Sequence, residues 1–332
     1  MSPTSGSRSD RRDPRAFSPG RRSFLAGAAA VAGWAAAASA VEPPPGTLEI
    51  GRPVPSSGSG VRPPGLRHSM VNWCYAKHFA SPEAMCDAAR RLGIASIELC
   101  PPEIWPTVKR HGLDVAIASS HGFAKGFCRT EHHAFCLAKL EEVMTQASAA
   151  GVPQVITFTG FNVDPEAKSG PLTMPVDRET GVANCVAGLK EAARLAEKHG
   201  VKVSLEMLNT RDPETMKGHP GYFGDSIDLC YEIVQAVGSP QVGLLFDLYH
   251  VQIMHGDLIR RVGECADRIF HVHTAGVPGR NEIDDAQEIN YRPVIAALAK
   301  AGYGGYLGHE FIPTRDAEAG LAEAVRACTV PA

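Results

Sequence analysis

The sequence predicts an α/β fold, a closed (β/α)8 TIM barrel, from the order of its segments. Short β-rich segments alternate with amphipathic helical segments over most of the 332 residues. Strict alternation requires a parallel sheet with right-handed crossovers, and eight repeats in about 265 residues fit a closed barrel. An open, doubly wound sheet is the alternative, but no Gly-x-Gly-x-x-Gly motif opens the first helix.

The expected elements follow one another regularly along the chain. Strands are expected at residues 70–75, 96–100, 115–120, 155–160, 201–208, 242–250, 269–275 and 306–311. Helices are expected, among others, at residues 82–92, 132–150, 183–199, 227–237 and 292–301. Glycines stand where helix C-caps are expected, at Gly93, Gly112, Gly151, Gly200, Gly238 and Gly302.

The N-terminal segment differs in composition from the rest of the chain. Residues 1–40 carry a net charge of +4, whereas the remaining residues carry −7. Arg21 and Arg22 precede an alanine-rich run, and Ala38-Ser39-Ala40 forms a small-x-small cleavage signal. These features predict a twin-arginine signal peptide that is cleaved after Ala40, the twin-arginine export machinery as a partner, and a periplasmic or secreted location. The apolar run is too short to span a bilayer comfortably, so no stable membrane insertion is expected.

The rest of the chain divides into a linker and one catalytic domain. Residues 41–67 are rich in proline, glycine and serine and are expected to form a flexible linker, followed by the barrel at residues 68–332. All nine cysteines fall in the barrel, and their odd number without a Cys-x-x-Cys motif predicts buried, reduced core residues. The acidic barrel argues against nucleic acid as a partner. A homo-oligomer is compatible with the sequence.

Ionisable residues interrupt the apolar strands near their expected C-terminal ends, where barrel enzymes place their active sites. Glu206, Asp247, His273 and Glu310 come from four consecutive strands. Burying one such charge without a partner is costly, so four together require a common partner. A divalent metal ion meets this need, and the oxygen-rich set suits Mn²⁺ or Mg²⁺, with Co²⁺ or Zn²⁺ as alternatives. A salt-bridged barrel mouth is the structural alternative.

His271 lies two residues before His273, so both side chains are expected on the same face of their strand. His271 is either a substrate-binding residue or a core histidine one layer lower in the barrel. Trp73 is expected at the end of the first strand, where it either forms an apolar wall above the metal or packs the barrel mouth.

Four spaced motifs resemble those of hydroxypyruvate isomerases, in the xylose isomerase-like barrel superfamily. The resemblance covers residues 68–315, and its motifs are Glu206-Met207-Leu208-Asn209, Phe246-Asp247-Leu248-Tyr249-His250, Val277-Pro278-Gly279-Arg280 and Gly308-His309-Glu310-Phe311-Ile312-Pro313.

The resemblance implies an isomerase and assigns roles within it. Glu206 and Glu310 would form the acid/base pair while also contacting the metal, and Asp247 and His273 would complete its coordination. Arg280 would hold an anionic or hydroxylated substrate end. The remaining expected substrate contacts are His250 and Asn209.

The expected reaction moves a proton between adjacent carbons through an enediolate, with hydroxypyruvate giving tartronate semialdehyde. The substrate is expected to be a small hydroxy-keto acid or a sugar. Typical hydroxypyruvate isomerases carry glutamine at position 273, whereas the epimerases carry histidine, as this chain does. A ketose 3-epimerase or a polyol dehydratase is therefore the alternative. A non-catalytic sugar-binding barrel is a weaker one, because both glutamates are present.

Overall fold

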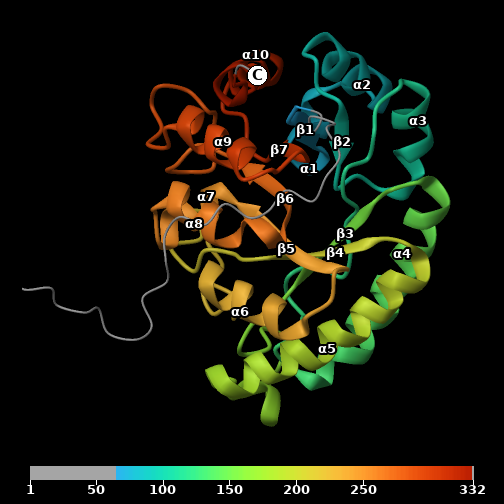
Figure 1. Cartoon of the computed structure of the whole chain (residues 1–332), viewed down its shortest axis with the longest axis vertical. Coiled ribbons are helices and arrows are strands. Elements are labelled where there is room, and N and C mark those ends of the chain that lie inside the picture. The colour runs from blue at the N-terminus through green and yellow to red at the C-terminus, as the bar shows by residue number, and fades with distance from the viewer. Residues whose placement is uncertain (1–64, 331–332) are drawn as a thin grey trace, which may run out of the picture. The chain divides into compact units, whose positions relative to one another are not determined.

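The structure, a computed structural model, describes residues 65–330. The predicted signal peptide and most of the predicted linker lie outside these residues. The described part is a curled parallel sheet surrounded by helices (Figure 1). Its strand order is β2-β1-β7-β6-β5-β4-β3. The barrel architecture expected from the alternation is confirmed.

The strands are β1 (Arg67–Val71), β2 (Ser96–Glu98), β3 (Gln154–Phe158), β4 (Lys202–Glu206), β5 (Val242–Asp247), β6 (Ile269–Thr274) and β7 (Tyr306–His309). The helices are α1 (Asn72–Tyr75), α2 (Pro82–Arg91), α3 (Trp105–Arg110), α4 (Thr130–Ala150), α5 (Arg178–His199), α6 (Ile227–Val237), α7 (Leu248–Met254), α8 (Leu258–Cys265), α9 (Tyr291–Lys300) and α10 (Ala317–Cys328). Four short 3₁₀ helices lie at Ala76–His78, Pro102–Ile104, Pro171–Thr173 and Ala266–Arg268.

The prediction of a regular strand at residues 115–120 is wrong. Only isolated bridges occur there, from Asp114 to Ser96 of β2 and from Ala118 to Val155 of β3. The physical reason is that a side chain replaces a backbone acceptor: the amide of Ala116 donates to the Ser96 hydroxyl at 2.9 Å instead of to a carbonyl on β2. The segment nevertheless joins the two edge strands of the sheet and completes the barrel.

The strands expected at residues 70–75 and 242–250 extend beyond the C-terminal ends of the observed strands β1 and β5. Residues 72–75 form helix α1 and residues 248–250 begin helix α7, so Trp73 lies in a helical turn after β1. The Asp247 side chain accepts a hydrogen bond from the Tyr249 amide at 2.8 Å. This contact is an N-cap, which starts a helix directly after the strand. The six glycines expected at helix ends all have positive φ, as C-caps require.

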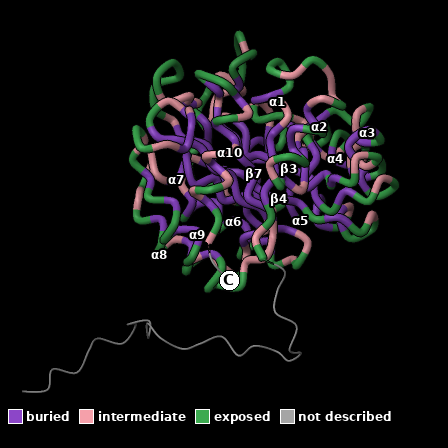
Figure 2. Tube along the Cα trace, turned by 90° about the horizontal axis from the view of Figure 1, so that it is seen from above, coloured by how far each residue is buried: buried purple, intermediate pink, exposed green. Residues whose placement is uncertain are grey.

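Side chains alternate between two apolar clusters along the strands. Leu244 and Phe246 of β5 face outward and pack under the helices, whereas Leu245 belongs to a smaller cluster with Ile156 and Phe158. Figure 2 shows the buried part of the trace gathered in the middle of the domain and the exposed part at its outside. All nine cysteines are buried and free of disulfides, as expected. Within residues 65–330, no helix has both the length and the apolar character needed to cross a membrane.

The alternation also decides which residues point into the barrel. Asp247 lies on the inner side of β5, as Leu245 does. On β4, Val203 and Leu205 face outward, so Glu206 faces inward. Asp247 is the register partner of His273 on β6. The charged residues of neighbouring strands therefore meet inside one end of the barrel.

We expect the change Gly126→Ala to destabilise the fold. A Cβ at this position would lie 2.2 Å from the amide nitrogen of Gly160, just beyond β3, and 2.3 Å from the carbonyl carbon of Thr159. Both contacts are with backbone, so the free energy of unfolding should fall by about 1–3 kcal/mol in urea denaturation. The control Gly263→Ala lies in α8 with open space around it and should not destabilise. Equal stabilities for the two variants would contradict the close approach.

Candidate metal and catalytic site

Four of the expected site residues meet at the C-terminal ends of the strands. One ligand atom from each of Glu206, Asp247, His273 and Glu310 lies within 4.8 Å of the others. All four side chains are buried. Glu206, Asp247 and His273 come from β4, β5 and β6, and Glu310 follows directly after β7. The cluster expected from the sequence is therefore present as a geometric unit.

Two atoms of this cluster have no hydrogen-bond partner among the described residues. They are Oε1 of Glu206 and Nδ1 of His273, which lie 3.6 Å apart. Nδ1 also lies 2.7 Å from Oε2 of Glu310. Burial lowers the pKa of His273, but the charge of Glu310 outweighs burial and raises this pKa well above its usual value. Buried polar atoms in proteins nearly always have partners. Unpartnered carboxylate and imidazole atoms that converge in this way fit a metal ion between them.

Arg280 adds a positive charge to the cluster. Its Nη2 donates to Oδ2 of Asp247 at 3.0 Å and also to Oε2 of Glu310, and its Nε donates to the Glu310 carbonyl at 3.2 Å. The sequence assigned this residue to the substrate, whereas in the structure it also neutralises two of the acidic side chains. Nη1 makes no hydrogen bond among the described residues, and Arg280 lines the cavity above the cluster.

The loop that carries Arg280 is fixed by backbone and side-chain hydrogen bonds. The Ile312 amide donates to the Arg280 carbonyl at 2.6 Å. Two residues farther on, the buried Glu282 accepts hydrogen bonds from the amide and hydroxyl of Thr314 at 2.7 and 2.8 Å. Arg280 itself has a φ of +60°, a conformation that non-glycine residues rarely adopt. The loops after β6 and β7 therefore hold the guanidinium in place together.

The two glutamates of the cluster differ in their electrostatics. Burial raises the pKa of Glu206 above its usual range. Burial acts in the same direction on Glu310, but the charges of Arg280 and His273 outweigh it and lower the Glu310 pKa. Burial also raises the pKa of Asp247. The charged form of two of the three carboxylates is thus disfavoured by desolvation, which an additional cation at the cluster would relieve.

The cavity above the cluster has a volume of about 540 Å³. Its charged floor includes Glu206, Glu310 and Arg280, and its walls are largely apolar. Trp73 lines it and donates from Nε1 to Oε1 of Glu310 at 2.9 Å. The indole therefore both forms an apolar wall and holds one of the candidate acid/base groups.

Three expected substrate contacts do not line this cavity. Nδ1 of His250 accepts the Asn209 amide at 3.1 Å, so Asn209 holds this ring. The Nε2 of His250 lies 3.5 Å from Oδ2 of Asp247, and burial lowers the pKa of His250 well below its usual value. His271 is buried one layer lower and contacts Glu98.

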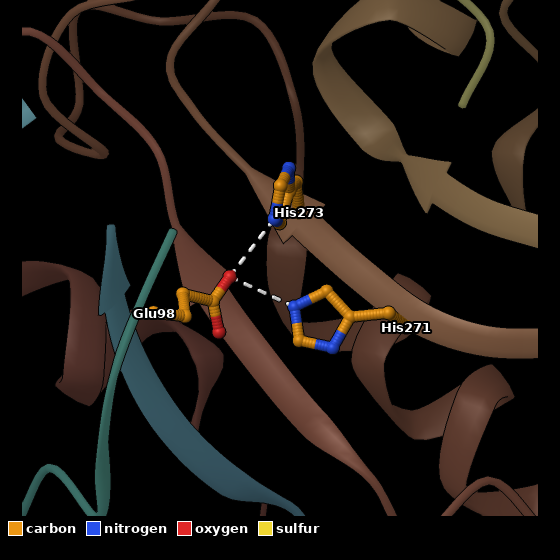
Figure 3. Close-up of side chains that lie close together, drawn as sticks. All are labelled: Glu98, His271 and His273. Carbon is orange, nitrogen blue, oxygen red and sulfur yellow. Dashed lines mark hydrogen bonds and ion pairs between the residues drawn. The ribbon is translucent and has the colours of Figure 1, made fainter. Parts of the chain in front are cut away.

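Sequence reasoning missed several residues. Glu98, at the end of β2, accepts hydrogen bonds from His271 and His273 and is fully buried (Figure 3). It could have been found by the same rule as the other carboxylates, because it interrupts an expected strand. Phe123, Phe158 and His219 line the cavity without any comparable pattern in the sequence.

Comparisons with known proteins concern the family and the fold of this chain. A family model described as a xylose isomerase-like TIM barrel matches residues 86–329. The human protein named "Putative hydroxypyruvate isomerase" is 29% identical over 77% of this chain and 83% of its own. The 2-oxo-tetronate isomerase of Haemophilus influenzae is 27% identical over 71% of this chain and 89% of its own.

Among solved structures, "AP endonuclease, family 2 from Brucella melitensis" has a TM-score of 0.66 at 25% identity, covering 78% of this chain and 97% of that one.

The change Arg280→Met should lower the free energy of unfolding by about 3–5 kcal/mol in the presence of EDTA. It leaves the buried carboxylates of Asp247 and Glu310 without their shared cation. Thermal and urea unfolding measure the loss. Arg260→Met, which removes an exposed arginine that also has two carboxylate partners, should change stability much less. Similar losses in both variants would contradict the buried pairing.

The curated relatives are isomerases, as the sequence predicted for this chain. Because the family model spans residues 86–329, which is most of its length, the chain belongs to the xylose isomerase-like TIM barrel family.

Proposed function

We propose that this protein is a metal-dependent isomerase that converts hydroxypyruvate into tartronate semialdehyde. The observation that carries this proposal is the convergence of Glu206, Asp247, His273 and Glu310, with two unpartnered ligand atoms directed at one another. Relatives named as hydroxypyruvate and 2-oxo-tetronate isomerases support the choice of a small oxo acid as substrate.

The donor set suits a hard or borderline divalent cation. Three carboxylates and one imidazole favour Mn²⁺ or Mg²⁺, and the imidazole also admits Co²⁺ or Zn²⁺. When bound, such an ion polarises a substrate carbonyl and stabilises the negative charge that develops on its oxygen. Glu206, Asp247, His273 and Glu310 would hold the ion.

The two glutamates would move the proton. One removes a proton from C3 of hydroxypyruvate, and the other delivers a proton to C2, while the hydroxyl proton on C3 passes to the C2 oxygen. The substrate thereby changes from a hydroxyketone to a hydroxyaldehyde without gain or loss of atoms. Trp73 holds Oε1 of Glu310 in a fixed position, and Arg280 holds Oε2, so the carboxylate is oriented for this transfer.

Arg280 would orient the substrate carboxylate. Its Nε and Nη2 are held by Glu310 and Asp247, which leaves Nη1 for a ligand in the cavity. A charge-assisted hydrogen bond from this atom would hold the acid end of hydroxypyruvate at the guanidinium. The neighbouring apolar walls would exclude water from the reacting carbons.

A ketose 3-epimerase is the second candidate, and the size of the cavity favours it. If each non-hydrogen atom took as much space as a water molecule in the liquid, about 30 Å³, hydroxypyruvate would occupy roughly 200 Å³. The cavity of about 540 Å³ could therefore hold a six-carbon sugar. Return of the proton to the opposite face of the same carbon would then give the epimer. A polyol dehydratase would begin with the same proton abstraction.

We also propose that the protein is exported by the twin-arginine machinery. Arg21-Arg22 before an apolar run, with Ala38-Ser39-Ala40 after it, supports cleavage after Ala40 and a periplasmic or secreted location. This route carries folded proteins, which agrees with nine buried cysteines that form no disulfide. A homo-oligomer remains compatible with the sequence.

Solvent deuterium exchange tests the proposed reaction. With Mn²⁺ and hydroxypyruvate in D₂O, the wild-type protein should incorporate deuterium and form tartronate semialdehyde, as followed by NMR. Glu206→Gln and Glu310→Gln should each lower the rate by about 10²- to 10⁴-fold, because each removes one group of the acid/base pair. Glu103→Gln, on the surface, should leave the rate unchanged.

The substrate panel decides between the candidate activities. Exchange at C3 of a ketose without reaction of hydroxypyruvate would replace the isomerase assignment with an epimerase. Unchanged exchange in both glutamate variants would show that these side chains are not the acid/base pair.

A further inference from the structure

We propose that Glu98 is a positioning residue that fixes the ring orientation and the tautomer of His273. Its Oε1 lies 2.9 Å from Nε2 of His273 and 2.8 Å from Nε2 of His271 (Figure 3). The other nitrogen of His273, Nδ1, faces the acidic cluster. The inference rests on the metal site of the proposed function, because it concerns how one ligand of that site is held.

The hydrogen bonds to Glu98 determine where the hydrogen of His273 resides. An ionised carboxylate only accepts hydrogen bonds, so Nε2 of each histidine must carry a hydrogen. A neutral imidazole that is protonated at Nε2 has its lone pair on Nδ1. In metal-bound His273 this lone pair would face Glu206 and Glu310, where the metal would take it up. A carboxylate behind a metal-bound histidine is the usual way to fix such a ring.

A second set of contacts below Glu98 agrees with this assignment. Nδ1 of His271 lies 3.4 Å from the amide nitrogen Nε2 of Gln154. The Oε1 of Gln154 accepts a hydrogen bond from the Ser204 hydroxyl at 2.8 Å, which orients the amide. Because Nε2 of Gln154 can only donate, Nδ1 of His271 must accept, and its hydrogen must be on Nε2. The buried polar groups from Ser204 to His273 therefore share one consistent set of hydrogen positions.

Gly308 of β7 provides the space for Glu98. A Cβ at this position would lie 2.3 Å from Oε1 of Glu98 and 2.7 Å from Cδ2 of His273. Gly308 is also the register partner of His273 on the neighbouring strand. The carboxylate reaches the imidazole only because the intervening residue has no side chain.

Glu98, His271 and His273 could instead be read as ligands of a second metal ion. That reading requires the hydrogen to leave Nε2 of both histidines. In neutral His273 the hydrogen would then be on Nδ1, where it would point into the acidic cluster and exclude the first ion. Oε1 of Glu98 already accepts from two donors, so only Oε2 of Glu98 lacks a hydrogen bond in this second group, whereas the first group offers Oε1 of Glu206 and Nδ1 of His273 among the described residues. The structure therefore favours the positioning role.

Mn²⁺ binding to the full chain tests the inference, with the free ion measured by electron paramagnetic resonance. Glu98→Ala should weaken binding by about 10- to 100-fold, as is typical for loss of such a carboxylate. Glu98→Gln should restore part of this loss, because its amide oxygen can still accept from both histidines. Gly308→Ala should also weaken binding, since the added methyl group displaces Glu98. Glu103→Ala, which removes an exposed glutamate, is the matched control and should bind as wild type does.

A second measurement does not depend on variants that fold poorly. In the wild-type protein without metal, ¹⁵N NMR of labelled histidine should show a hydrogen on Nε2 of His273, assigned by loss of the signal in His273→Gln. A His273 ring whose Nε2 carries no hydrogen overturns the inference, as does wild-type affinity in a folded Glu98→Ala protein. If the wild-type protein binds no Mn²⁺, the proposed function fails and the inference fails with it. Wild-type binding with an unaffected Glu98→Ala overturns the inference alone.

Discussion

The acidic residues at the end of the barrel must be compensated by positive charge, and much of the local structure serves this need. Glu206, Asp247 and Glu310 are buried at the ends of apolar strands, where an unpaired carboxylate is unfavourable by several kcal/mol. Arg280 and His273 supply part of the compensation through contacts with Asp247 and Glu310. Oε1 of Glu206 and Nδ1 of His273 form no hydrogen bond among the described residues, and a divalent cation would take up these two atoms.

The fold meets this requirement with elements that lie far apart in the sequence. Strand alternation points the acidic residues inward, and the hydrogen bond from Tyr249 to Asp247 begins α7 at the same place. The loop after β6 carries Arg280 back over the cluster and is held to the loop after β7 through Glu282. The cluster is thus supported from several sides, which fixes its geometry before a ligand arrives.

The cavity combines a charged floor with apolar walls, an arrangement suited to proton transfer between carbon atoms. Apolar walls such as Phe158 and Trp73 lower the local polarity, so that the charges on the floor act more strongly on a bound carbonyl compound. The same walls do not restrict the substrate to three carbons. The floor of the cavity therefore indicates the type of reaction, whereas the walls indicate less about which substrate is bound.

Much of this protein could be predicted from the sequence by itself. The alternation of segments determined the barrel, because a parallel sheet with short helical connections has few other closures. The four-residue cluster was also predictable, since charges at the ends of apolar strands are costly unless they share a partner. Glu98 obeys the same rule, and its position in an expected strand was sufficient to find it.

Only the tertiary structure decided how these residues pair. It replaced a regular strand at residues 115–120 with isolated bridges, because the Ser96 hydroxyl takes the place of a backbone acceptor. In the structure, Arg280 forms hydrogen bonds with Asp247 and Glu310, and Asn209 forms one with His250. Glu98 forms hydrogen bonds with both His271 and His273. Such pairs join residues that are distant in the chain, and their distances depend on the curvature of the whole sheet. Local sequence patterns fix which side of a strand a residue faces, but they do not fix which partner it meets across the barrel.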